Sequence, residues 1–156
     1  DAQPQFPSGV RDVATIDLDL DGRLDGAVLL SDRIVASLPI TAKSDAPKPV
    51  VVSVMISGDF QHLLAVDLDD DVDAKLRDRP KDAAGCLLAD PDLIAFGSSG
   101  VRLFENRLTE NNTREFSEKP AGDAIGSLRN VLDVVPVDLD LDGDLDFFTI
   151  ASDGIR

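Results

Sequence analysis

Short apolar segments separated by clusters of polar residues recur along the whole chain. Their length and their content of Val, Ile, Leu and Phe predict β-strands, and the Gly, Pro, Asn and Asp between them predict turns. The one stretch with a helical pattern is 73–88. We therefore expect an all-β fold, with strands at 25–30, 34–38, 50–56, 62–66, 92–96, 101–106, near 114–117 and at 131–137.

An aspartate motif interrupts this pattern three times, each time directly after an apolar segment. Residues 17–25 read DLDLDGRLD and residues 138–146 read DLDLDGDLD. The middle copy begins alike at Asp67 and departs after Asp71. Repetition at this spacing indicates a repeat architecture.

The middle copy is lengthened by an insertion at about 74–91, so that its closing aspartate is Asp92. Removing the insertion restores a period of about 50 residues, with about four strands between consecutive loops. These are the dimensions of one β-propeller blade. We expect blades of four antiparallel strands in a single segment over 1–156, with two complete repeats and a partial repeat at each end.

The motif Asp-x-Asp-x-Asp-Gly-x-x-Asp suits a hard divalent cation. Alternate residues of a tight loop point the same way, so the carboxylates at positions 1, 3, 5 and 9 converge and would repel one another without a cation. Ca²⁺ accepts six to eight oxygen ligands in such a loop, whereas Mg²⁺ requires a stricter octahedron. The expected ligands are Asp17, Asp19, Asp21, the carbonyl oxygen of Arg23 and Asp25 in the first loop, and Asp138, Asp140, Asp142, the carbonyl oxygen of Asp144 and Asp146 in the third. An EF-hand is excluded because position 12 holds Val28 or Thr149 rather than Glu, and strands rather than helices follow.

The middle loop departs from the pattern, because Val72 stands where the turn favours Gly. Its candidate ligands are Asp67, Asp69, Asp71 and Asp92, and Asp73 is an alternative to one of them. We expect this site to be weaker or altered. The insertion has two interpretations, a solvated excursion or a contact surface raised above the sheet.

Composition excludes several classes of function. The net charge is −15, with Asp far more abundant than Glu, so the chain would be repelled by nucleic acids and by anionic membranes. No apolar run is long enough to cross a membrane. The single histidine, His62, and the single cysteine, Cys86, rule out a zinc site of several His or Cys within this chain, and we expect both residues to be structural.

The aspartate loops, and the apolar strand after each, resemble the FG-GAP/VCBS repeat family. The segment 96–106, FGSSGVRLFEN, is similar to the hairpin that follows the loop in that family. The resemblance covers most of 10–156, and the middle loop departs from it in its missing Gly and its insertion. It implies a propeller of about seven blades, structural calcium, and a role in binding rather than chemistry.

Two functions remain at this point. The first is a non-catalytic calcium-binding propeller module of a secreted, cell-surface or periplasmic protein, acting in protein or ligand binding, adhesion or scaffolding. The alternative is the propeller portion of a secreted enzyme, such as a polysaccharide lyase or a hydrolase. Two repeats do not close a propeller, so we expect the remaining blades to come from the same longer chain or from further copies.

Overall fold

The structure is a computed structural model that describes residues 8–18, 23–38, 50–68, 91–107, 115–120, 122–140 and 145–155. Within these ranges the chain is all-β, with eleven strands in three antiparallel sheets and one short helix. The expected fold class is confirmed at this level.

Each sheet is built from strands that are neighbours in the sequence. The first sheet, in the order β1-β2-β3-β4, contains β1 (Asp12–Ile16), β2 (Asp25–Leu29), β3 (Arg33–Leu38) and β4 (Val50–Met55). The second, in the order β5-β6-β7-β8, contains β5 (His62–Val66), β6 (Asp92–Gly97), β7 (Gly100–Asn106) and β8 (Phe116–Lys119). The third, in the order β11-β10-β9, contains β9 (Val131–Val137), β10 (Asp146–Ala151) and β11 (Gly154–Ile155).

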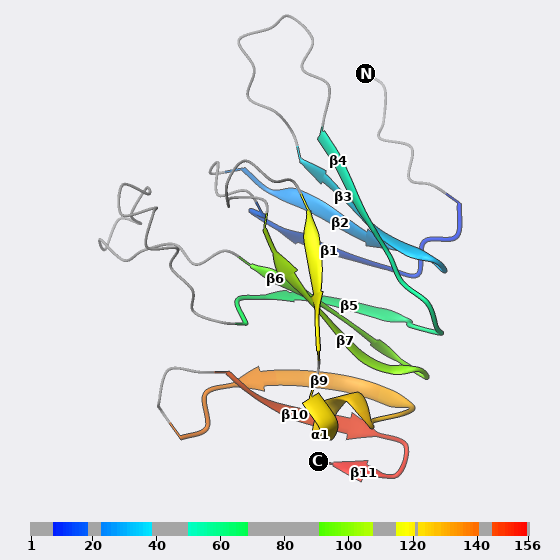
Figure 1. Cartoon of the computed structure of the whole chain (residues 1–156), viewed down its shortest axis with the longest axis vertical. Coiled ribbons are helices and arrows are strands. Elements are labelled where there is room, and N and C mark those ends of the chain that lie inside the picture. The colour runs from blue at the N-terminus through cyan, green and yellow to red at the C-terminus, as the bar shows by residue number, and fades with distance from the viewer. Residues whose placement is uncertain are drawn as a thin grey trace, which may run out of the picture.

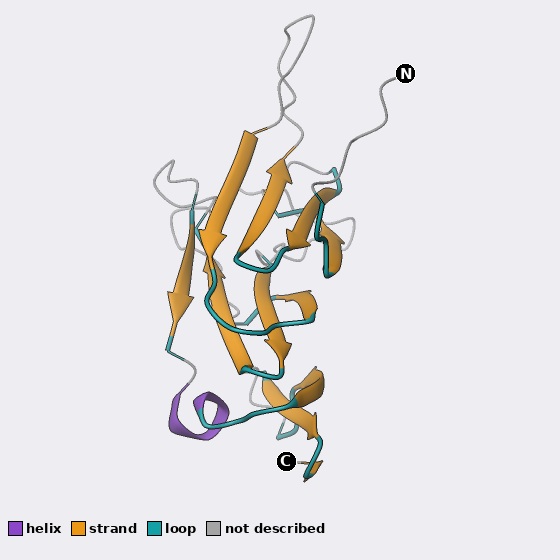
Figure 2. Ribbon diagram, turned by 90° about the vertical axis from the view of Figure 1, so that its right-hand side faces the viewer, coloured by secondary structure: helices purple, strands orange, loops and turns teal. Residues whose placement is uncertain are grey.

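The three sheets follow one another along the long axis of the molecule in chain order (Figure 1). The helix α1 (Gly122–Gly126) connects β8 to β9 and lies beside the third sheet (Figure 2). The sequence analysis does not predict this helix. The expected helix at 73–88 lies outside the described residues.

Apolar side chains fill the two spaces between consecutive sheets. Leu29, Leu93 and Phe104 belong to the cluster between the first and second sheets, and Ile94 and Val131 belong to the cluster between the second and third. All six residues of β6 are buried, because this strand has a neighbouring sheet on each face. Alternate side chains of a strand point to opposite faces, so β6 contributes Leu93 to one cluster and Ile94 to the other.

The sequence analysis is wrong about which strands share a sheet. It assigns 62–66 to the same unit as 25–30, whereas β5 pairs with β6, with Leu63 opposite Ala95. The same offset places 131–137 with β10. The reason is that each aspartate loop connects two antiparallel neighbours within one sheet, so the strand before a loop pairs with the strand after it. Counting from loop to loop therefore cuts every sheet after its first strand.

The turn between β6 and β7 is held close to the segment that leads into the third sheet. Gly100 has a φ of +107°, and a Cβ at this position would lie 2.4 Å from the carbonyl oxygen of Leu128. The N–H of Asn130 donates to the carbonyl of Ser98 at 3.1 Å. Only glycine combines this backbone conformation with so close an approach. The contact fixes the third sheet against the second at the end opposite the aspartate loops.

Candidate metal centres at the three aspartate loops

Each aspartate loop joins the ends of two paired strands. The last pair of residues before the loop is Ile16 with Asp25 in the first sheet and Val66 with Asp92 in the second. In the third sheet Val137 pairs with Asp146. The strand ends that carry the loops all lie on the left-hand side of the stack in Figure 1. Because the register is the same in the three hairpins, the two strand ends that bound each loop have the same arrangement. We call this arrangement the frame of the loop.

A hydrogen bond closes each of these frames in the same way. The N–H of the residue at position 2 donates to the carboxylate Oδ2 of the closing aspartate. The bonds run from Leu18 to Asp25 at 2.7 Å, from Leu68 to Asp92 at 2.9 Å, and from Leu139 to Asp146 at 3.2 Å. A carboxylate held by the backbone at the mouth of the loop is oriented before any cation arrives.

The middle loop keeps this geometry across its insertion. Asp92 occupies the same place in its hairpin as Asp25 and Asp146, as the sequence analysis predicts, and its backbone is paired with Val66. The alternative ligand Asp73 and the turn residue Val72 lie outside the described residues. The middle loop therefore has the same frame as the other two loops.

The three closing aspartates differ in their exposure. Asp25 and Asp92 are 3% and 2% exposed, whereas Asp146 is exposed. The second and third sheets cover the hairpins of the first and second, and this burial removes the two carboxylates from water. A buried carboxylate requires hydrogen bonds or a nearby cation to offset the loss of hydration. Backbone N–H groups supply such hydrogen bonds to both buried carboxylates, that of Leu18 to Asp25 and that of Leu68 to Asp92.

The structure describes the two ends of each loop and not the middle. Of the predicted ligands, Asp17, Arg23, Asp25, Asp67, Asp92, Asp138, Asp140 and Asp146 lie within the described residues. Asp19, Asp21, Asp69, Asp71, Asp142 and Asp144 lie outside them. Among the described residues alone, no three His, Cys, Asp or Glu side chains come together as a metal site. The donor set nevertheless consists entirely of oxygens and carries several negative charges per loop, which is the chemistry that calcium requires.

Asn106 contributes to the site in a way that the sequence analysis does not predict. It is 3% exposed at the end of β7. Its backbone N–H donates to Oδ1 of Asp92 at 2.6 Å, and its side-chain Nδ2 donates to the carbonyl of Leu18 at 2.8 Å and of Pro91 at 3.0 Å. The signal in the sequence is a polar residue that ends an apolar strand, which the family resemblance includes without giving it a role.

The other residues singled out in the sequence are structural or lie outside the described ranges. His62 is exposed, stacks on Phe96 with ring centroids 5.1 Å apart, and has Nδ1 3.8 Å from a carboxylate oxygen of Asp12. The same Asp12 oxygen accepts the N–H of Leu63 at 2.9 Å, which ties the first sheet to the second. Cys86 lies in the insertion, outside the described residues.

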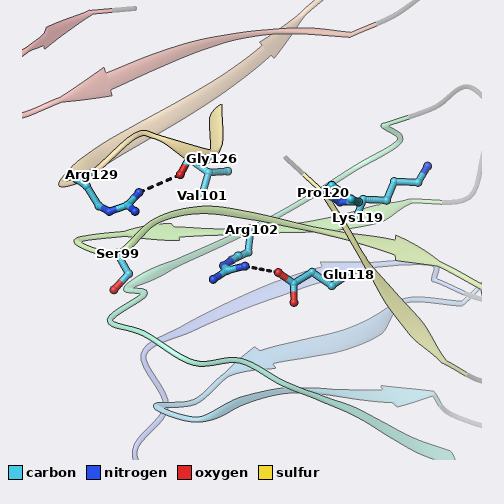
Figure 3. A pocket seen from close by; sticks show the side chains of 8 residues that line it. All are labelled: Ser99, Val101, Arg102, Glu118, Lys119, Pro120, Gly126 and Arg129. Atoms are coloured by element: carbon cyan, nitrogen blue, oxygen red, sulfur yellow. Dashed lines mark hydrogen bonds and ion pairs between the residues drawn. The ribbon is translucent and has the colours of Figure 1, made fainter. Parts of the chain in front are cut away.

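A solvent-open hollow of about 330 Å³ lies between β7, β8 and α1, away from the aspartate loops (Figure 3). Its basic side chains already have partners. Arg102 forms an ion pair with Glu118, and Arg129 donates to the carbonyl of Gly126 at 3.0 Å. The first contact joins two strands of the second sheet, and the other lies within the segment that leads into the third sheet.

The comparisons with known proteins add no relative. No protein-family model matches the chain, and neither a curated protein nor a solved structure matches it. Within the described residues no helix has the length and apolar character needed to cross a bilayer.

Proposed function

We propose that this chain is a calcium-stabilised, non-catalytic module built from consecutive four-stranded sheets in a propeller arrangement. The observation that carries the proposal is the repeated frame of the aspartate loops, in which the closing carboxylate accepts the N–H of position 2 in all three hairpins. One such contact would be a local turn. Three equivalent contacts, each beside a loop rich in Asp, support a repeated cation site of the FG-GAP/VCBS type.

The charge of the loops favours calcium. Each loop motif contains several aspartates and ends at a closing aspartate that the backbone has already oriented, and two of the closing aspartates are buried. A bound Ca²⁺ neutralises the repulsion between these carboxylates and links the two strands of the hairpin. The described residues that would hold the cation are Asp17, Asp25 and the carbonyl oxygen of Arg23 in the first loop, and Asp67 and Asp92 in the middle loop.

The outer face of the third sheet supports a longer stack of sheets. The residues two and four places after the closing aspartate are buried in the first two sheets, where they face the next sheet. These are Ala27 and Leu29 in the first sheet and Ile94 and Phe96 in the second.

The same two positions in the third sheet hold Phe148 and Ile150, which are 43% and 37% exposed. Apolar residues at positions that are otherwise covered favour a further sheet of the same repeat on this face. We infer that this sheet comes from the same longer chain or from another copy. The partner of the completed module is a protein or another extracellular ligand, and the proposed location is outside the cytoplasm, where calcium is abundant.

A role in binding rather than catalysis agrees with the use of the chain's reactive groups. The aspartates cluster in loops where a coordinated carboxylate makes a poor general acid. His62 packs on Phe96 and lies beside Asp12, whose carboxylate accepts the N–H of Leu63 in the same strand as His62. These contacts give the histidine a structural role.

Thermal melting with and without a calcium chelator tests the proposal. A cation that binds only the folded state stabilises it by mass action, so the chelator should lower the melting temperature of the wild type. Asp21→Ala and Asp142→Ala should lower it in calcium and respond less to the chelator. Asp32→Ala, the same substitution at an exposed turn outside the loops, is the matched control and should behave as the wild type. An unchanged melting temperature in chelator would overturn the proposal.

A further inference from the structure

A continuous path of hydrogen bonds joins the first aspartate loop to the middle one through Asn106. It begins at Oδ2 of Asp25, which accepts the N–H of Leu18 at 2.7 Å. The carbonyl of Leu18 accepts Nδ2 of Asn106 at 2.8 Å. The N–H of Asn106 then donates to Oδ1 of Asp92 at 2.6 Å, and Oδ2 of Asp92 accepts the N–H of Leu68 at 2.9 Å.

Every central group of this path is removed from water. Leu18 is 0% exposed, and Asp25, Asp92 and Asn106 are each at most 3% exposed. A buried hydrogen bond has no water to replace it, so breaking one leaves a polar group unsatisfied. Displacing one member of the path therefore weakens the hydrogen bond of the next.

Both ends of Asn106 act on parts of a predicted cation site. The carbonyl of Leu18 belongs to the planar peptide group that leads into Asp19, the ligand at position 3 of the first loop. Holding this carbonyl therefore fixes the orientation of the peptide group at the point where the chain leaves Leu18. At its other end, the backbone N–H of Asn106 holds one oxygen of Asp92, the closing aspartate of the middle loop.

We propose that Asn106 is a positioning residue that couples the first and middle aspartate loops, so that cation binding at one raises the affinity of the other. This inference rests on the proposed calcium function. Binding at either loop adjusts the position of the carboxylate or peptide group that Asn106 holds there. Because Asn106 bonds both groups, the adjustment reaches the other loop. The coupling is reciprocal, as linkage requires. The third loop belongs to a separate hairpin and serves as the internal reference.

The test uses backbone amides as reporters of single loops during a calcium titration followed by NMR. The N–H groups of Leu18, Leu68 and Leu139 report the first, middle and third loops. Asp67→Asn weakens the middle site and leaves the Asn106 bonds in place. We expect this variant to shift the calcium midpoint of the Leu18 amide at least about 5-fold upward and to leave that of Leu139 unchanged.

Asn106→Ala completes a double-mutant cycle. In this background Asp67→Asn should no longer move the Leu18 midpoint, because the path between the loops is cut. Asp12→Ala is the matched control, since it removes another hydrogen bond between the first and second sheets, at the far end of β1. In the Asp12→Ala background the effect of Asp67→Asn on Leu18 should persist, which separates coupling from a general loosening of the two sheets.

The outcomes distinguish the two proposals. If calcium moves none of the three amides in the wild type, the proposed function is wrong. If calcium moves them but Asp67→Asn leaves the Leu18 midpoint unchanged, the calcium function stands and the coupling through Asn106 is refuted. This second comparison uses only the wild type and Asp67→Asn, so it remains decisive if Asn106→Ala does not fold.

Discussion

The first and the middle aspartate loops have different lengths and the same closing geometry. The first runs from Asp17 to Asp25, whereas the middle loop reaches Asp92 from Asp67 only after the insertion. Both closing carboxylates are nevertheless buried and accept the N–H of position 2, at 2.7 and 2.9 Å. The position of the closing ligand is therefore set by the register of the hairpin and not by the length of the loop.

The two loops also show what the hairpin does not control. Gly22 gives the first loop a residue suited to positive φ, and the middle loop has Val72 at the same place in its motif. A frame of two strands orients the first and last ligands, while the turn between them depends on its own residues. We expect the middle site to have the frame of a cation site with a less favourable turn.

Removing a closing carboxylate should have the largest effect on the free energy of unfolding. Asp92→Ala deprives two backbone donors, those of Leu68 and Asn106, of their acceptor in a buried setting, and should cost about 2–4 kcal/mol in chelator. Asp146→Ala, at an exposed position, should cost only about 0.5–1.5 kcal/mol. Urea denaturation of both variants measures the difference. Equal losses would show that burial does not distinguish the two frames.

Exchanging the residues at position 6 of the first and middle loops should have an intermediate effect, on calcium affinity. Gly22→Val should lower the calcium affinity of the first loop by about 10-fold or more, because a β-branched residue resists positive φ. Val72→Gly should raise the affinity of the middle loop. Amide-resolved calcium titration of each variant measures both changes. If Gly22→Val leaves the affinity intact, Val72 gives no reason to expect a weaker middle site.

An exposed ion pair in the first sheet should have the smallest effect. A hydrogen bond from the Arg33 side chain, with a smaller contribution from its charge, lowers the pKa of Asp32. A lowered carboxylate pKa stabilises the fold above the unfolded-state pKa, and this contribution is lost as the pH falls through the folded-state value. Because the pair lies at the surface, Asp32→Asn should leave the melting temperature at pH 7 essentially unchanged. A large loss would mean that the turn, rather than the loops, anchors this sheet.

Individual strands can be predicted from the sequence, because short apolar segments between turn residues indicate strands and mark their ends. The strand expected at 131–137 has those bounds, and the one expected at 92–96 is one residue longer. The grouping into sheets is wrong, because spacing along a chain does not say whether a loop lies within a sheet or between two sheets. The equivalence of Asp92 to Asp25 follows from the apolar strand after each, and the strand pairing confirms it.

The role of Asn106 depends on contacts between residues far apart in the sequence. Its side chain reaches Leu18, which lies 88 positions earlier. No local pattern near β7 contains that information, and only the packing of the second sheet on the first brings the two residues together. The exposure of Asp146 and the burial of Asp25 likewise depend on which face a neighbouring sheet covers.

The most direct test of the central claim is calcium binding to chelator-stripped protein, measured by isothermal titration calorimetry and checked by native mass spectrometry. The account predicts one calcium ion bound at the first loop and one at the third, with a weaker additional ion at the middle loop. Asp25→Asn should reduce the uptake by one ion, whereas Asp32→Asn should not. A stripped protein that takes up no calcium and melts at the same temperature with and without it would contradict the account.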